Sequence, residues 1–87
     1  MKRKDIVVGA VYLDDLGRQV KIHAVDPGWA VNEQGEWVER KVPGRRYSRG
    51  NWTFVETNFN IRVEVLNVHS EQWHKEVILP RHLVKKI

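Results

Sequence analysis

The sequence predicts an all-β protein, a small antiparallel barrel or sandwich of about five to seven short strands. Apolar residues recur with a period of two along most of the chain, which is the pattern of strands with one buried face. Turn-forming residues separate these segments at intervals of about ten residues. No window of about eleven or more residues has the apolar stripe of an amphipathic helix. A closed barrel is the favoured form because it removes the exposed edges that a flat sheet would present.

Each predicted strand is an apolar or alternating segment that ends at turn-forming residues. The first segment ends at residues 14–17, where Gly17 can adopt the positive φ of a tight turn. Pro27 and Gly28 end the second segment, since proline fixes φ and glycine allows the chain to reverse. The strands are predicted at residues 10–13, 20–25, 29–31, 52–57, 61–65 and 73–79.

The pattern is less regular in the middle of the chain and after the fifth strand. Residues 36–42 are either a strand or part of a long loop, and residues 45–51 are expected to form an exposed loop because they are rich in loop formers. Residues 58–60 are expected to form a turn or a bulge. Leu66 and Val68 shift the apolar residues to the opposite phase, which predicts a bulge or a strand that crosses between sheets.

The chain is expected to form one domain, residues 1–87, with an elaborated loop region at about residues 32–51. A chain of this length buries only about 60–65% of its unfolded surface, which allows one thin core and no deep catalytic cavity. There is no cysteine, which excludes disulfides and thiolate zinc sites. No segment has the apolar length of a signal peptide or the roughly 20 apolar residues that span a bilayer. We therefore expect a cytoplasmic protein with no membrane partner.

The stretch from Trp29 to Trp52 combines aromatic rings with cations. Tryptophan offers a large π-face and arginine a flat, permanent cation, a combination that suits a polyanion with stackable bases. The same combination forms hot spots of protein interfaces. Burial of tryptophans in a small core and solvation of arginines in a loop are the competing interpretation. The candidate binding residues are Trp37, Arg40, Lys41, Arg45, Arg46, Tyr47, Arg49 and Trp52.

The distribution of charge matters more than its sum. Fifteen Lys and Arg residues against eleven Asp and Glu residues give a net charge of +4, which is modest for a protein that coats nucleic acid. The cations cluster at residues 2–4, 40–49 and 81–86. A fold that brings these clusters together would create a local field stronger than the net charge suggests.

Residue types that support catalysis or metal binding are present, but not in the patterns that such chemistry needs. His69 and His74 lack the spacing of a helical histidine pair, and no cysteine supports a zinc site. Ser48 and Ser70 have no nucleophile signature around them. No glycine-rich phosphate loop occurs. We therefore expect no enzyme activity, no bound metal and no cofactor.

The two ends of the chain carry recognisable patterns. Residues 79–87, Leu-Pro-Arg-His-Leu-Val-Lys-Lys-Ile, resemble the end of a Src-homology-3-like barrel, where a proline starts a short 3₁₀ turn before a final strand. Residues 2–12, Lys-Arg-Lys-Asp-Ile-Val-Val-Gly-Ala-Val-Tyr, are similar to the start of short proteins encoded by bacteriophages. The resemblance implies a small barrel with a 3₁₀ turn near Pro80. It does not imply binding of proline-rich peptides, because His82 replaces the tyrosine of the final turn.

Three functions are compatible with these observations. The favoured one is a non-catalytic binding module, a phage-type effector in the cytoplasm of a bacterial host that binds a host protein such as a nucleic-acid-handling or defence enzyme. The alternative is a barrel that binds nucleic acid directly, with Arg45, Arg46 and Arg49 on phosphates. Tyr47 and a tryptophan would then stack on a base. A structural role through homodimerisation at an unclosed barrel edge is the third, so either a monomer or a homodimer is expected.

Overall fold

The computed structural model describes residues 1–39, 46–49, 52–55 and 60–87 of the chain. In these residues it contains nine β-strands, two short 3₁₀ turns and no α-helix. The 3₁₀ turns are η1 (Arg3–Asp5) and η2 (Pro80–His82). The strands are β1 (Val11–Asp14), β2 (Gln19–Ala24), β3 (Trp29–Val31), β4 (Trp37–Glu39), β5 (Arg46–Arg49), β6 (Trp52–Val55), β7 (Ile61–Asn67), β8 (Gln72–Ile78) and β9 (Leu83–Lys86).

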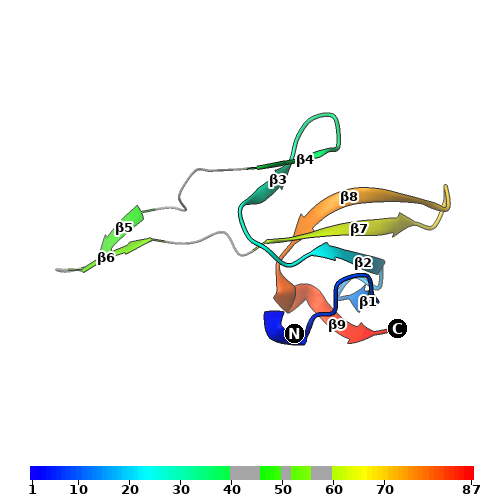
Figure 1. The fold of residues 1–87 in the computed structure, drawn as a ribbon, viewed down its shortest axis with the longest axis horizontal. Helices are drawn as coiled ribbons and strands as arrows, with labels where there is room; N and C mark the ends of the chain where they lie inside the picture. Colours follow the sequence, from blue (N-terminus) through cyan, green and yellow to red (C-terminus); the bar gives the residue numbers. More distant parts are fainter. Residues whose placement is uncertain (40–45, 50–51, 56–59) are drawn as a thin grey trace.

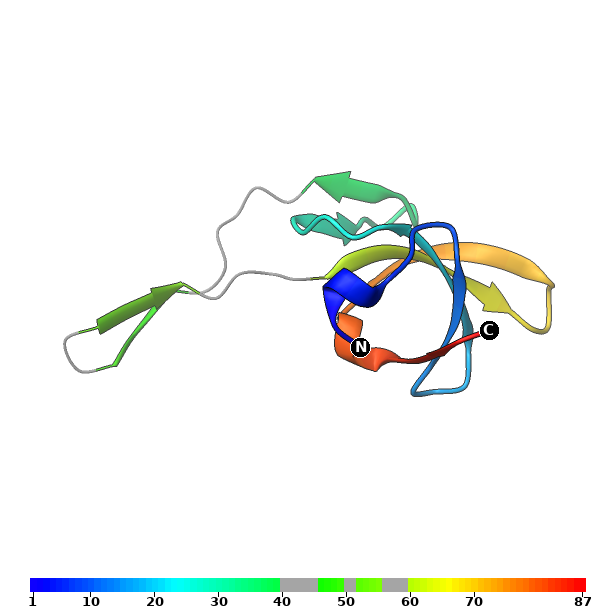
Figure 2. The same cartoon turned by 60° about the horizontal axis from the view of Figure 1, so that its bottom comes forward.

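Five of the strands form one antiparallel sheet in the order β8-β7-β2-β1-β9 (Figure 1). The last strand, β9, returns to lie beside the first, β1, so both ends of the chain share one side of the sheet. Two further antiparallel hairpins, β3–β4 and β5–β6, come between β2 and β7 in the sequence. Figure 2 shows the main sheet curving, with η1 and η2 side by side. The end strands β8 and β9 do not pair with each other.

The hydrophobic core lies on the inner face of the main sheet. Apolar residues at alternate positions of β2 and β7 point to this face, as the period of two predicts. Tyr12 of β1 is 1% exposed, and its hydroxyl accepts a hydrogen bond of 2.9 Å from the Val7 backbone N–H. This bond ties the N-terminal segment to the core. The buried apolar residues are Ile6, Tyr12, Val20, Ile22, Ile61, Val63, Val65, Ile78 and Leu83.

The prediction of an all-β, antiparallel protein is confirmed. Residues 29–31 form β3 as expected, and the turn after the first strand contains Gly17 with a φ of 78°. The 3₁₀ turn at Pro80 and the short strand after it are also present. Proline starts η2 because its fixed φ suits a tight turn and its missing N–H leaves no donor unpaired there.

Two predictions about the middle of the chain need correction or completion. Residues 46–49, expected to be part of an exposed loop, form β5, because the backbone there pairs with β6 in register from Arg46–Val55 to Arg49–Trp52. Residues 37–39 form β4, which decides between strand and loop for that part of the 36–42 segment. The described chain therefore has more strands than the five to seven expected. The turn predicted at 58–60 and the end of the 52–57 strand lie mostly outside the described residues.

The prediction of a bulge or a sheet crossing at Leu66 and Val68 is wrong. Strands β7 and β8 pair without interruption from Ile61–Ile78 to Asn67–Gln72. The apolar residues change phase there for two separate reasons: Leu66 lies on the outer face opposite Trp73, and Val68 lies in the turn after the strand. The register shifts elsewhere, on β2 between Ile22 and Ala24 and on β1 between Leu13 and Asp14.

The thin core predicts a steep cost for removing buried volume. Ile61, which is fully buried, lies in the strand at the centre of the core. Ile61→Ala should lower the free energy of unfolding by about 2–5 kcal/mol, measured by urea denaturation, because it leaves a cavity. Val68→Ala, at a side chain 73% exposed, is the matched control and should change it by less than about 0.5 kcal/mol. Equal effects of the two substitutions would contradict this placement of the core.

Candidate interaction surfaces

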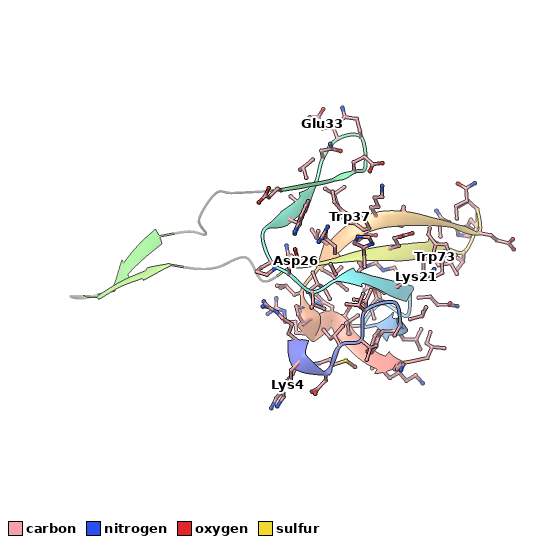
Figure 3. The ribbon with its side chains drawn as sticks, viewed as in Figure 1. Lys4, Lys21, Asp26, Glu33, Trp37 and Trp73 are labelled. Atoms are coloured by element: carbon pink, nitrogen blue, oxygen red, sulfur yellow. The ribbon has the colours of Figure 1, made fainter. Side chains whose placement is uncertain are left out.

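The outer face of strands β2, β7 and β8 carries a tryptophan layer, which the β3–β4 hairpin partly covers (Figure 3). We use this name for three half-buried tryptophans, each with a cation of the main sheet against its ring. Trp73 and the three cations alternate with inward-facing side chains along these strands, so they share one face of the pleated sheet. Trp29 and Trp37 are the first residues of β3 and β4, and the hairpin brings them to this face. The members of the layer are Trp29, Trp37, Trp73, Lys21, Arg62 and Lys75.

Trp37 attaches the β3–β4 hairpin to the edge of the main sheet. Its indole Nε1–H donates to the backbone carbonyl of Glu76 in β8, at 3.0 Å. The His23 ring lies 4.3 Å from the Trp37 ring, centroid to centroid, and the Lys75 ammonium lies 5.3 Å from it. Lys75 also forms an ion pair with Glu36, the residue before β4. Trp37 therefore bridges the hairpin and the sheet instead of projecting into solvent.

Trp29 belongs to a compact group of three side chains. The Arg62 guanidinium stacks over the Trp29 ring at 3.9 Å, and Asp26 binds both partners. One Asp26 oxygen accepts from Trp29 Nε1 at 2.9 Å, and the other accepts from Arg62 at 2.8 Å. These hydrogen bonds, from Arg62 first and Trp29 second, hold the pKa of Asp26 below its ordinary value. The guanidinium and the ring are thus held together within the fold by Asp26, although the buried Arg62 Nε has no hydrogen-bond partner.

Trp73 lies at the far end of the layer, beside the β7–β8 turn. The Lys21 ammonium of β2 is 4.8 Å from the centre of its ring. Leu66 is the cross-strand partner of Trp73. All three tryptophans that the structure describes in full therefore have an intramolecular cation over one face, a contact worth about 0.5–1 kcal/mol at such sites. A nucleic-acid base that stacked on that face would have to displace the cation.

A polar bridge lies on the opposite side of the sheet, next to the core. Asp14, 4% exposed, accepts hydrogen bonds at one oxygen from the backbone N–H groups of Leu16 and Arg18, at 3.0 and 2.7 Å. Its other oxygen pairs with Arg18 Nε at 2.8 Å. Arg18 then reaches Glu76 of β8 at 3.1 Å, and Glu76 also contacts His74. The bridge links the first hairpin to the far end strand of the sheet.

A hollow of about 390 Å³ lies beside the bridge. Asp14, Arg18 and Leu79 are among its lining residues. At its rim His82 Nδ1 pairs with Asp15 at 2.7 Å, which joins η2 to the β1–β2 turn. Asp14 is paired with Arg18, and Asp15 with His82, so these polar side chains of the hollow already have hydrogen-bond partners.

A basic side is formed by η1, η2 and β9. The amino group of Met1 donates to the carbonyl of Pro80 at 3.3 Å, and this contact brings the two ends of the chain together. Lys4 lies on the opposite side of the molecule from Trp37 (Figure 3). The fold thus joins two of the three basic clusters seen in the sequence. The exposed cations of this side are Lys2, Lys4, Arg81, Lys85 and Lys86.

The predicted binding residues are only partly within the described chain. Trp37 lies in the tryptophan layer, whereas Arg40, Lys41 and Arg45 lie outside the described residues. The others lie on the β5–β6 hairpin, whose register pairs Arg49 with Trp52 and Tyr47 with Phe54. The structure therefore places Arg46, Tyr47, Arg49 and Trp52 on one hairpin and Trp37 on another.

Sequence reasoning did not single out Trp73, Lys21 or Arg62 as site residues. Each is part of a regular period-two strand, and only the strand order shows that they share a face with Trp37. Across the described residues, no three His, Asp or Glu side chains are grouped to hold a metal ion. Neither short helix of the described chain has the length and apolar composition to cross a membrane.

The Asp14 contacts make stability depend on pH. Burial alone would raise the pKa of Asp14, but the hydrogen bonds and charge of Arg18, with the Leu16 N–H, outweigh it, so the pKa lies below its ordinary value. This stabilisation is fully present above the unfolded pKa of about 3.9 and is lost as pH falls through the folded pKa. Asp14→Asn should lower the free energy of unfolding at pH 7 by about 1.5–3 kcal/mol.

Urea denaturation of the native chain and of Asp14→Asn over pH 7 to 2 measures this effect. The native chain should lose stability below about pH 4, and the loss should be smaller in the variant. Glu33→Gln, at an exposed carboxylate in the β3–β4 turn, is the matched control and should follow the native profile. An Asp14→Asn profile parallel to that of the native chain would contradict the assigned role.

Comparisons with known proteins give no relative for this chain. No family model matches it, and neither a curated protein sequence nor a solved structure matches it. Its function is therefore inferred from its own residues and their geometry.

Proposed function

We propose that this chain is a non-catalytic binding module that recognises another protein. Support for a Src-homology-3-like barrel comes from the strand order, in which the last strand lies beside the first, and from the 3₁₀ turn at Pro80 before β9. The Arg18 side chain, which reaches from the first hairpin to β8, is the contact that would hold such a barrel together. In this proposal the β3–β4 and β5–β6 hairpins are additions between the second and third barrel strands.

One observation carries the proposal: exposed apolar side chains stand next to cations at the basic side. Val84 and Ile87 are 61% and 62% exposed, and Lys85 and Lys86 lie between them. Exposed apolar area is surface that a protein partner can cover, and neighbouring cations can steer an acidic partner toward it. The tryptophan layer also favours a protein partner over nucleic acid. Its cations already bind rings and carboxylates within the fold, so they are less available to phosphates.

The N-terminal pattern, similar to short bacteriophage proteins, extends the proposal. A phage-type effector that occupies the surface of a host protein needs no catalytic residues of its own. The partner we propose is a host nucleic-acid-handling or defence enzyme, met in the bacterial cytoplasm. An acidic region on such a partner would explain the basic surface without direct contact between this chain and nucleic acid, because complementary charge steers association and suppresses wrong partners.

Affinity capture from a bacterial lysate tests the proposal. The tagged chain should recover one protein in stoichiometric amount, and nuclease treatment should leave the recovery unchanged. Val84→Ser should weaken binding to the purified partner by at least about fivefold in calorimetry, because it removes exposed apolar area from the interface. Val68→Ser is the matched control, at an apolar side chain of similar exposure in the β7–β8 turn. If no protein is recovered, or if the two variants behave alike, the proposal fails.

Direct binding of nucleic acid is the second candidate. The β5–β6 register favours it, because it pairs Arg49 with Trp52 and so joins a cation and an aromatic residue of the predicted cluster. Trp52→Phe leaves the three tryptophans of the layer as the fluorescent reporters. If the chain binds a protein and not nucleic acid, short single- and double-stranded oligonucleotides should leave the tryptophan fluorescence of both this variant and the native chain unchanged at low salt. A salt-sensitive shift in the native chain alone would favour the nucleic-acid candidate.

A further inference from the structure

The outer edge of β9 is not paired with any other described strand. β9 pairs with β1 along one edge only and ends the strand order. The Ile87 N–H donates to the carbonyl of Val11 at 2.9 Å, so it points toward β1. Backbone groups of successive residues alternate in direction in an antiparallel ladder, so the N–H and C=O of Lys86 point away from β1. A bulge opposite Leu13 and Asp14 leaves only a short open edge.

The two outer edges of the main sheet, at β8 and β9, differ in what lies against them. At the other end of the strand order, the Glu76 carbonyl of β8 accepts the Trp37 indole N–H, and the β3–β4 hairpin packs against that strand. No other strand of the described chain pairs with the outer edge of β9. An unpaired edge is a template for strand addition unless charge or a short length prevents it.

Charge decides which strand the β9 edge accepts. Lys85 and Lys86 lie on the strand itself, and Arg81 lies in η2 just before it. Lys2 and Lys4 are on the neighbouring N-terminal segment, which Met1 holds against Pro80. Two acidic side chains of this side, Asp5 in η1 and Asp15, offset part of this charge, and Asp15 is itself paired with His82. The open edge therefore lies in a positive local field.

We propose that the outer edge of β9 binds an extended, acidic segment of a partner protein as an added strand. This inference rests on the proposed function and names the chemistry of the partner. A second copy of the chain is disfavoured, because two β9 strands side by side would bring four lysines into one ladder. Nucleic acid is disfavoured because the basic side has no exposed tryptophan or tyrosine among the described side chains: Tyr12 is buried, and the tryptophans of the layer lie on the outer face of the main sheet. The one partly exposed ring of this side, His82, is paired with Asp15.

Two substitutions at Lys86 separate the backbone from the side chain. Lys86→Gln removes the charge and keeps the outward N–H, whereas Lys86→Pro removes both. Proline is tolerated at an edge position whose N–H faces solvent, so the β1–β9 ladder should remain. Circular dichroism and urea denaturation should show that each variant is folded before its binding is measured.

The probe is a synthetic seven-residue peptide of alternating glutamate and valine, capped at both ends, with an alternating lysine and valine peptide as its control. In amide NMR titrations the acidic peptide should shift the resonances of Val84 to Ile87 and bind at least about tenfold more tightly than the basic one. Lys86→Gln should weaken binding about two- to fivefold, and Lys86→Pro about tenfold or more. Lys21→Gln, on the tryptophan layer, is the control for loss of one charge and should bind as the native chain does.

Several results would overturn the inference. Equal binding of the two peptides, or shifts confined to other strands, would show that the edge is not the site. A dimer in sedimentation that Lys86→Pro abolishes would assign the edge to a second copy of the chain. An oligonucleotide that shifts the same amides at lower concentration than the acidic peptide would assign it to nucleic acid. If the captured partner binds Lys86→Pro as tightly as the native chain, this site fails while the binding module stands; if nothing is captured, the proposed function itself fails.

Discussion

The buried carboxylate of Asp14 is the contact on which the rest of the fold depends. A charge in the interior is unfavourable unless hydrogen bonds compensate it, and Asp14 receives two backbone N–H groups and the Arg18 guanidinium. These bonds fix the tight turn between β1 and β2 and orient Arg18 toward the opposite end of the sheet. There Arg18 meets Glu76, which belongs to β8. In a chain with one thin core, a single polar bridge across that core limits how far the sheet can open.

Glu76 connects this bridge to the outer face. Its carboxylate binds Arg18 on the core side, and its backbone carbonyl accepts the Trp37 indole N–H of the β3–β4 hairpin. One residue of β8 thus ties together the first hairpin, an end strand of the sheet and the inserted hairpin. The hairpin in turn covers that end of the sheet. The cover leaves β9 as the less protected of the two end strands, which gives the molecule one open edge and one closed one.

The sequence predicts well what depends on neighbouring residues. Alternation located β2 and β7, and Pro80 located η2, because burial of one face and the fixed φ of proline act locally. Ser48 and the flanking glycines favour turns and so predict a loop at the residues of β5, yet pairing with β6 overrides that preference. Strand composition is a weak guide when the partner strand decides the outcome.

The candidate sites are even harder to predict from local sequence than the strands. Trp37 is conspicuous in the sequence, but its partner Glu76 is 39 residues away, and Arg62 is 36 residues from Asp26. Such contacts follow from strand order, which no local pattern encodes. The meeting of residues 2–4 with residues 81–86 is likewise a product of β9 returning beside β1.

The position of β9 beside β1 also explains how a chain with a modest net charge has two different surfaces. On the outer face, Arg62 and Lys75 bind rings and carboxylates of the fold, so little of their field extends into solvent. On the basic side, Lys85 and Lys86 extend from an end strand, with Lys2 and Lys4 on the segment next to it. At physiological salt a field of this kind acts over about 8 Å, which is enough to orient an acidic strand as it approaches the edge. Backbone pairing would then supply the register, and the exposed apolar side chains of Val84 and Ile87 would supply most of the buried area. In the proposed complex, charge would select the partner, while the open edge and the apolar side chains would hold it.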